Sequence, residues 1–352
     1  MHGAGAHLLP AAIAQRAPVP DPLVSILLPA WQADGTLPAC LRSITRQTDP
    51  RWECVVVDDG STDATAAIAQ AATRDPRFRV VTTPHRGIVA ALRTGLDACR
   101  GRWVARMDAD DLMHRDRLRL QLAALADDPT LTAVGTHVRV FPRANLRDGF
   151  RDYERWLAEI VTPLQVRTEA FVESPLVHPT LMIDRARLTT LGYHDVDWPE
   201  DYDLVLRLLA AGDAIGVVPE RLLLWRDTPT RLTRTHPRYT QTQITACKAA
   251  FLATGILAGQ PRYVLWGYGQ TGRALRSALA LYDKHPAYIV ELHPGRLGNR
   301  IHGAPVVPYT DIPTLPPLPL IASVAGVEPR TEIRTALRAM HRTELIDFVC
   351  AA

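Results

Sequence analysis

The sequence alternates between short apolar runs and segments with helical periodicity, and this alternation constrains the fold more than any other feature. Four apolar runs end in polar turn residues, at 24–28, 54–57, 78–81 and 103–107. Helices are expected at 37–47, 63–73, 88–99 and 116–126, with a long helical stretch at 150–172. Strands separated by helix-length segments indicate right-handed βαβ units, and continuous apolar strands are typical of a sheet covered on both faces. We therefore predict an α/β fold with a mostly parallel central sheet.

The chain of 352 residues is long enough for two or three domains. Strands at 181–183 and 215–218 and helices at 200–211 and 239–253 complete the first half. A second strand–turn–helix pattern begins at 263–266, followed by strand candidates at 288–291, 320–324 and 348–349. The boundaries that we predict are a disordered N-terminal arm at 1–22, a large α/β domain at 23–253, a linker at 254–261 and a small Rossmann-like domain at 262–352.

Composition excludes several classes of protein. There are 40 basic and 37 acidic residues, so the net charge of +3 does not suit a nucleic-acid-binding domain. No stretch approaches 18 uninterrupted apolar residues, so we expect no transmembrane segment. The five cysteines are scattered and form no CxxC pair, which supports neither a disulfide framework nor a zinc site. We expect a protein of a reducing compartment, the cytoplasm.

Acidic residues gather where two predicted strands end. Asp58 and Asp59 follow the second strand, and Asp108, Asp110 and Asp111 follow the fourth. In open parallel sheets, ligands bind at the carboxyl ends of the strands. Several carboxylates at one edge repel one another unless a cation compensates, and Mg²⁺ and Mn²⁺ prefer such oxygen ligands together with substrate phosphates. Any single aspartate could instead cap a helix, but helix capping explains the whole set less well than a cation does.

Five segments extend this hypothesis: VSILLPAW, CVVVDDGSTD, RGIVAALRTG, GRWVARMDADD and WPEDYDLVLRL, in this order. Together they resemble the catalytic domain of family 2 glycosyltransferases, which have the GT-A fold. The resemblance covers residues 23–253, about two thirds of the chain. It implies an inverting hexosyltransferase that moves a sugar from a nucleotide-sugar donor, expected to be UDP-linked, to an acceptor hydroxyl in bacterial polysaccharide biosynthesis.

The resemblance also implies roles for individual residues. Asp201 is expected as the general base, with Glu200 beside it. Asp58 is expected to accept a hydrogen bond from the nucleotide base. The expected donor-binding residues are Pro29, Asp58, Asp59, Arg93, Asp108 and Arg231. The divalent cation, Mn²⁺ or Mg²⁺, is assigned to Asp110, Asp108 and His236. The segment 232–236 resembles the loop that closes over the diphosphate, where Arg226, Arg231, Arg234 and His236 are candidate phosphate partners.

These residue types suit glycosyl transfer. The diphosphate gains negative charge as the glycosidic bond breaks, and a metal ion stabilises that charge. The acceptor hydroxyl is a poor nucleophile, so a carboxylate must take its proton in the transition state. One base without a second catalytic carboxylate implies a single in-line displacement, and hence inversion at the anomeric carbon.

Two positions remain open. Arg93 stands where relatives commonly have Asn, so it either contacts the diphosphate or points outward as a surface charge. His178 precedes a predicted strand and either touches a substrate or is a structural histidine, which is the more common role of a single histidine.

A glycine turn marks the C-terminal part. Gly267, Gly269 and Gly272 follow a strand and open a helix, and Glu291 lies at the end of the next strand candidate. A glycine turn between a strand and a helix, followed by an acidic residue after the next strand, is the arrangement of a dinucleotide-binding motif. In that motif the phosphate approaches the helix N-terminus and the acidic residue binds ribose hydroxyls. However, 91 residues are too few for a full six-stranded fold. This domain either binds a nucleotide or serves as a structural or protein-docking module.

Two alternative functions therefore stay open beside glycosyl transfer. One is a nicotinamide-dependent oxidoreductase activity in the C-terminal domain, and the other is a catalytically silent sugar-nucleotide-binding module. The acceptor is a glycan, a lipid-linked molecule or a small molecule. A lipid-linked acceptor would require peripheral binding at the inner membrane surface.

Overall fold

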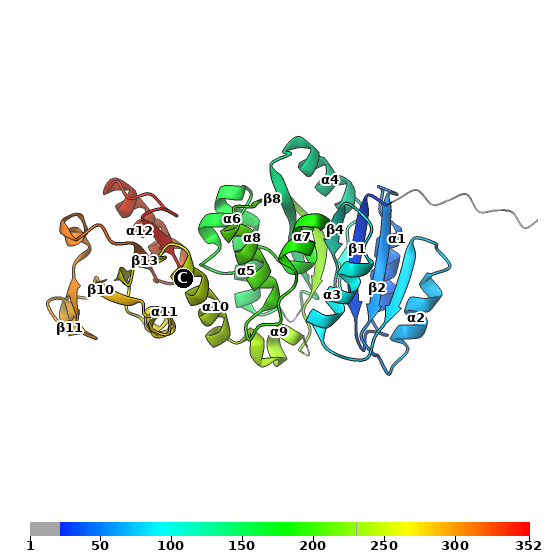
Figure 1. Cartoon of the computed structure of the whole chain (residues 1–352), viewed down its shortest axis with the longest axis horizontal. Coiled ribbons are helices and arrows are strands. Elements are labelled where there is room, and N and C mark those ends of the chain that lie inside the picture. Colours follow the sequence, from blue (N-terminus) through cyan, green and yellow to red (C-terminus); the bar gives the residue numbers. More distant parts are fainter. Residues whose placement is uncertain (1–21, 145, 230) are drawn as a thin grey trace, which may run out of the picture.

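A computed structural model describes residues 22–144, 146–229 and 231–352. The predicted N-terminal arm, apart from Pro22, lies outside the described residues. Figure 1 shows two sheet-containing halves that follow one another along the long axis of the molecule, with helix α10 (Gln241–Thr254) between them.

The first half is built on an eight-stranded sheet with the order β3-β2-β1-β4-β7-β6-β8-β5. The strands are β1 (Val24–Ala30), β2 (Trp52–Asp58), β3 (Phe78–Thr82), β4 (Trp103–Arg106), β5 (Leu112–Met113), β6 (Leu131–Phe141), β7 (Met182–Asp184) and β8 (Ala214–Arg226). Strands β3, β2, β1 and β4 are parallel to one another, as are β6 and β8, whereas β7 and β5 run antiparallel to their neighbours.

Helices cover both faces of this sheet. One core lies under α1 (Leu37–Thr45), α2 (Thr65–Ala72), α4 (Arg117–Asp127) and α5 (Asp148–Glu159). The other lies under α3 (Ile88–Ala98), α6 (Pro163–Glu169), α7 (Arg185–Leu191) and α8 (Glu200–Ala210). Because both faces are covered, every residue of β1 and β2 is buried, which explains their continuous apolar sequences. The predicted α/β fold with a mostly parallel central sheet is confirmed.

Besides β5 and α7, which were not predicted, three features of this half differ from the sequence-based expectation. The stretch 150–172 is not one helix but α5 and α6. Pro163 stands at the start of α6 and disfavours helical geometry in Thr162, whose side chain caps the new helix through Gln165. Strand β6 lies at 131–141, where no strand was predicted. Strand β8 extends to Arg226, eight residues beyond its predicted end, because it pairs with β6 along its length.

The second half contains a six-stranded sheet with the order β11-β12-β10-β9-β13-β14. The expectation that 91 residues are too few for six strands was therefore wrong, because three of these strands have only two or three residues each. Its strands are β9 (Arg262–Trp266), β10 (His285–Val290), β11 (Arg300–Ile301), β12 (Ala304–Val307), β13 (Leu320–Ala322) and β14 (Phe348–Cys350). All neighbouring strands are parallel except β11 and β12. Helices α10 and α11 (Gln270–Ala280) pack on one face, and α12 (Val327–Ala339) packs on the other.

Short helical segments complete the described chain. They are α9 (Leu232–Thr235) and the 3-10 turns His178–Thr180, Pro237–Tyr239, Pro294–Arg296 and Tyr309–Thr314. Within the described ranges, no helix is both long and apolar enough to cross a membrane.

Candidate active site

Three aspartates meet in the turn between β4 and β5, at the carboxyl end of the parallel strands. Asp108, Asp110 and Asp111 each offer a carboxylate oxygen, and these oxygens lie within 4.8 Å of one another. Asp111 is buried, and the other two are half-buried. Among the described residues, this is the one group of three or more acidic, histidine or cysteine side chains close enough to hold a metal ion.

The three carboxyl groups differ in charge state. Burial favours protonation of Asp108, but the Arg106 guanidinium donates to it at 2.6 Å and holds its pKa below the usual value. Burial and the charge of Asp108 raise the pKa of Asp110 to about 6. Burial, Asp108 and Asp110 raise the pKa of Asp111 well above its usual value. Clustered carboxylates that tend to hold protons are the arrangement that a divalent cation stabilises.

Asp111 supplies a further sign that this cluster suits a cation. Its Oδ1 accepts the backbone N–H of Arg226 at 2.7 Å. Its Oδ2 is buried and makes no hydrogen bond within the described chain. A buried carboxylate oxygen without a donor is costly, and a hard cation would satisfy it.

Arginines from the end of β8 approach the aspartate cluster. Arg226 donates through Nε to the Asp110 carbonyl at 2.6 Å. The Arg231 guanidinium lies over the Trp225 ring at 4.0 Å. Its positive charge helps to lower the pKa of Asp108 and opposes the rise in the pKa values of Asp110 and Asp111. Arg234 is paired with Asp227 at 2.7 Å. Of the candidate phosphate partners on this segment, Arg226 and Arg231 are therefore the two that act on the cluster.

Asp58 and Asp59 lie at the end of β2 and are both buried, but they differ in their contacts. Asp59 accepts the backbone N–H groups of Arg86 (3.0 Å) and Gly87 (2.8 Å) and lies 2.9 Å from Nδ1 of His85. It therefore anchors the loop at 83–87. Asp58 accepts the N–H of Ser61 at 3.2 Å.

An exposed aromatic surface lies beside these aspartates. Trp31 directly follows β1, is 51% exposed, and stacks on the His85 ring with centroids 4.5 Å apart. Because His85 also contacts Asp59, the loop at 83–87 and the end of β1 are held together at the sheet edge. A flat ring in this position can stack on a planar ligand.

Asp201 and Glu200 begin helix α8. Burial raises the pKa of Asp201 to about 7, and the neighbouring charges of Glu200 and Asp108 contribute in the same direction. Glu200 is buried and accepts the Tyr239 hydroxyl at 2.7 Å, with Arg238 at 3.8 Å. The charge of Asp108 therefore reaches Asp201, and a carboxyl group with a pKa of about 7 can exchange a proton near neutral pH.

With this geometry established, comparison with known proteins identifies the family. Residues 25–191 match the family description "Glycosyl transferase family 2". The putative glycosyltransferase EpsE of Bacillus subtilis is 31% identical over 198 residues, which cover 54% of this chain and 68% of EpsE. The chain is a family 2 glycosyltransferase.

Other relatives are longer proteins. The chondroitin synthase of Escherichia coli is 30% identical over 194 residues, which cover 54% of this glycosyltransferase but 27% of that synthase. The chain therefore spans about a quarter of the length of this relative. Among solved structures, S. aureus TarS 1-349 in complex with UDP-GlcNAc superposes with a TM-score of 0.53 at 17% identity, over 74% of this chain and 71% of TarS. At that identity the likeness supports the GT-A fold alone.

Several residues predicted for the site have other contacts in this glycosyltransferase. Pro29 is buried within β1. Arg93 donates through Nε to the Tyr193 carbonyl at 2.7 Å, so it links α3 to the loop before α8. His236 lies outside the aspartate cluster, and its Nδ1 accepts the N–H of Arg238. The third member of the group of close oxygens is Asp111; the assignment of a metal ion to His236 stays a prediction.

His178 is a buried histidine in the 3-10 turn before β7. Burial and the charge of Arg106 lower its pKa to about 3, so the ring is neutral. It packs against Tyr193, and its Nε2 makes no hydrogen bond within the described chain. These contacts favour the structural interpretation of this residue.

Sequence reasoning overlooked Trp31, His85, Arg106 and Tyr239 as parts of this site. Trp31 ends one of the matched segments, so its position directly after a strand was a usable signal. The contacts of Arg106 with Asp108 and of Tyr239 with Glu200 depend on the three-dimensional arrangement and have no local sequence signal.

Proposed function

We propose that this chain is an inverting, metal-dependent hexosyltransferase that moves a sugar from a UDP-linked donor to an acceptor hydroxyl. The observation that carries the proposal is the cluster of three aspartates after β4, whose oxygens lie within 4.8 Å of one another. Asp201, whose pKa burial and Glu200 raise to about 7, supplies the second group that the reaction needs. Glycosyl transfer needs both groups: the cluster, with its cation, to stabilise the leaving diphosphate, and Asp201 to accept the proton of the acceptor hydroxyl.

The aspartate cluster is proposed as the metal site. Asp110 and Asp108 would bind Mn²⁺ or Mg²⁺ as predicted, and the short separation of their oxygens from Asp111 supports adding that residue. When bound, the cation would neutralise charge that develops on the leaving diphosphate. Arg231, which already neutralises part of the charge on the cluster, would contact the same phosphates.

The donor base is proposed to bind between Asp58 and Trp31. Asp58 would accept the N3–H of uracil, and Trp31 would stack on the ring from its exposed position. The contacts of Asp59 with Arg86 and Gly87 favour a positioning role for it in place of direct donor binding. The complex of TarS with UDP-GlcNAc is consistent with a uridine donor.

Asp201 is proposed to take the proton of the acceptor hydroxyl. A base whose pKa is near the working pH is efficient, because it is both substantially ionised and basic enough to receive a proton. Glu200 would keep this pKa high through its negative charge, and Tyr239 would hold Glu200 in position. A single displacement on the sugar follows from one base, and therefore inversion.

We also propose how the activity is distributed. The transferase domain would occupy residues 23–253, with a linker at 254–261 and a second module at 262–352. The names of relatives such as chondroitin synthase support a glycan product. All five cysteines are buried free thiols, which is consistent with the cytoplasm. A lipid-linked acceptor would be reached at the inner membrane surface.

The test compares Asp201→Asn with Asp197→Asn, the same substitution at an exposed position four residues earlier. Asp201→Asn should lower the transfer rate by about 10²–10⁴-fold while UDP affinity with Mn²⁺ stays within about twofold. Asp197→Asn should keep both. A screen of UDP-sugars should identify the donor. NMR of the product should then show that the anomeric carbon of the transferred sugar has the configuration opposite to that in the donor.

Three results would contradict the proposal. Transfer by Asp201→Asn at the wild-type rate would show that Asp201 is not the general base. A product that retains the donor's anomeric configuration would exclude a single displacement. Transfer that is unchanged after exhaustive chelation of divalent cations would exclude metal dependence.

A further inference from the structure

A second pocket lies in the C-terminal half, far along the chain from the transferase motifs. Its volume is about 680 Å³, and it is lined by residues that follow β9, β10 and β13 together with the start of α12. The chain moves from β9 outward to β10 and β12, and then returns to place β13 on the other side of β9. The pocket therefore sits where the strand order reverses, which is where open parallel sheets bind ligands.

The glycine turn forms one side of this pocket. Gly267 has a φ of +94°, a conformation that favours glycine. A Cβ on Gly272 would lie 2.0 Å from the Gly267 carbonyl oxygen, so the start of α11 packs directly against the turn. These two glycines are explained by the protein's own packing.

Gly269 is different, because neither its backbone nor its packing requires glycine. Its φ is −75°, and a Cβ built there would meet no protein atom within 4 Å. It is the N-cap of α11, lines the pocket and provides no side-chain cap. The first N–H groups of a helix lack acceptors inside the helix, and α11 has no acidic residue in its first turn. The missing side chain leaves these donors open to an anion.

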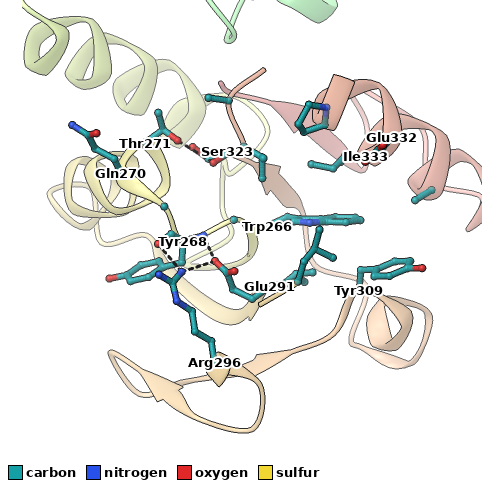
Figure 2. Close-up of a pocket in the computed structure, with 18 residues that line it drawn as sticks. Trp266, Tyr268, Gln270, Thr271, Glu291, Arg296, Tyr309, Ser323, Glu332 and Ile333 are labelled. Carbon is teal, nitrogen blue, oxygen red and sulfur yellow. Dashed lines mark hydrogen bonds and ion pairs between the residues drawn. The ribbon is translucent and has the colours of Figure 1, made fainter. Parts of the chain in front are cut away.

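One polar side chain in the pocket points to a ligand independently of the helix terminus, and a second is held in a fixed position beside it. Ser323 is 2% exposed, and its Oγ makes no hydrogen bond within the described chain, although it lines the pocket. Oε1 of Glu291 accepts the N–H of Tyr268 at 2.7 Å and a hydrogen bond from Arg296 at 3.1 Å. Figure 2 shows this carboxylate between the glycine turn and Trp266. Two fixed partners therefore orient it within the pocket.

The opposite wall is apolar. Trp266 and Tyr309 stack with ring centroids 5.9 Å apart, and Val290 and Ile333 line the same pocket. Figure 2 shows Trp266 and Tyr309 on one side of Glu291, with Ser323 and Thr271 toward the glycine turn. The pocket thus presents uncapped N–H donors, then a carboxylate, then an aromatic wall.

From this order of groups we infer that the C-terminal pocket binds a nucleoside 5′-diphosphate. The diphosphate lies at the start of α11, where Gly269 leaves room for it and Ser323 donates to it. Glu291 accepts hydrogen bonds from the ribose hydroxyls, and the base packs against the wall of Trp266. This site is separate from the proposed transferase site, and the inference does not depend on the transferase activity.

The test measures binding of ADP, NAD⁺ and UDP to the full chain by calorimetry, with EDTA present to suppress metal-dependent binding elsewhere. Gly269→Val places a side chain in this space, where its Cβ would meet no protein atom within 4 Å, and should abolish binding. Its matched control is Gly149→Val, at an exposed helix start where a Cβ also meets no atom within 4 Å. Glu291→Gln keeps an acceptor for Tyr268 but removes the charge, so binding should weaken by about tenfold. Glu328→Gln, outside the pocket lining, should bind as wild type.

The three ligands share a ribose 5′-diphosphate and differ in the rest of the molecule, so they show which class of nucleotide the pocket binds. Binding of ADP and NAD⁺ identifies an adenine nucleotide, and binding of UDP alone identifies a uridine nucleotide; either result supports the inference if Gly269→Val removes it. The inference is overturned if none of the three binds wild-type protein at up to about 1 mM. It is equally overturned if Gly269→Val, shown to be folded by circular dichroism, binds as tightly as wild type.

Discussion

Asp201 and Asp110 show how burial changes the acidity of single residues. The ordinary carboxyl pKa of 3.8 is raised to about 7 in Asp201 and to about 6 in Asp110, in both cases first by burial and then by a neighbouring carboxylate. The two neighbours differ: Glu200 acts on Asp201, and Asp108 acts on Asp110. Pairs of acidic groups whose environments shift their pKa values are typical of functional sites.

The raised pKa of Asp201 predicts the pH dependence of transfer. A general base works in its deprotonated form, so the rate should rise with pH through about 7 and fall about tenfold per pH unit well below it. Glu200→Gln removes a negative charge that raises this pKa, so its profile should shift to lower pH. The measurement is the transfer rate between pH 5 and pH 9 at saturating Mn²⁺. A wild-type profile that is flat between pH 6 and pH 8, or a Glu200→Gln profile that does not shift, would contradict this role.

At the scale of helices and strands, the alternation of patterns predicted most of the first half. Strands such as β1 and β2 are buried on both faces, so their apolar character is continuous and easy to recognise. The break at Pro163 was missed because Tyr153, Trp156 and Leu157 continue a helical pattern up to it. Strand β6 was missed because Gly135, Thr136 and His137 interrupt its apolar run, although all three are buried.

The candidate site was predictable where its residues lie at strand ends, and less so where long-range contacts determine their roles. Asp108 and Asp110 follow β4 directly, so their proximity could be inferred. The anchoring role of Asp59 depends on a loop more than 20 residues away, which Gly87 reaches only in the folded chain. The position of the Asp111 side chain depends on a hydrogen bond from the backbone N–H of Arg226, which is 115 residues away in sequence. No local pattern records such contacts.

At the scale of the whole molecule, the two halves share buried contacts. Residues of α10, including Leu252, belong to the core of the second sheet. Lys248 on the same helix is buried and donates to the Val172 carbonyl at 2.7 Å. Glu169 at the end of α6 pairs with Arg334 of α12 at 2.6 Å, and Arg334 also pairs with Glu344 at 2.9 Å. The C-terminal sheet is therefore packed against the transferase half.

The ion pairs between α6 and α12 predict that substitution of Arg334 destabilises the protein. Arg334→Ala removes the shortest ion pair of both Glu169 and Glu344, while Arg330 stays 3.7 Å from Glu169 and Arg338 stays 3.6 Å from Glu344, and should lower the free energy of unfolding by about 1.5–3 kcal/mol. The matched control is Arg338→Ala, because Arg338 is 65% exposed and lies 3.6 Å from Glu344; it should cost at most about 1 kcal/mol. Urea unfolding followed by circular dichroism checks both values. Equal stability of the two variants would show that the interface ion pairs contribute little.

The central claim is that the aspartates after β4 hold a divalent cation against the donor diphosphate, in the same site as Asp201. The most direct measurement is UDP affinity by calorimetry with and without Mn²⁺, in wild type, Asp110→Asn and the exposed control Asp127→Asn. We predict that Mn²⁺ strengthens UDP binding by about tenfold or more in wild type and in the control, and has no effect in Asp110→Asn. Equal strengthening in Asp110→Asn, or none in wild type, would contradict the account.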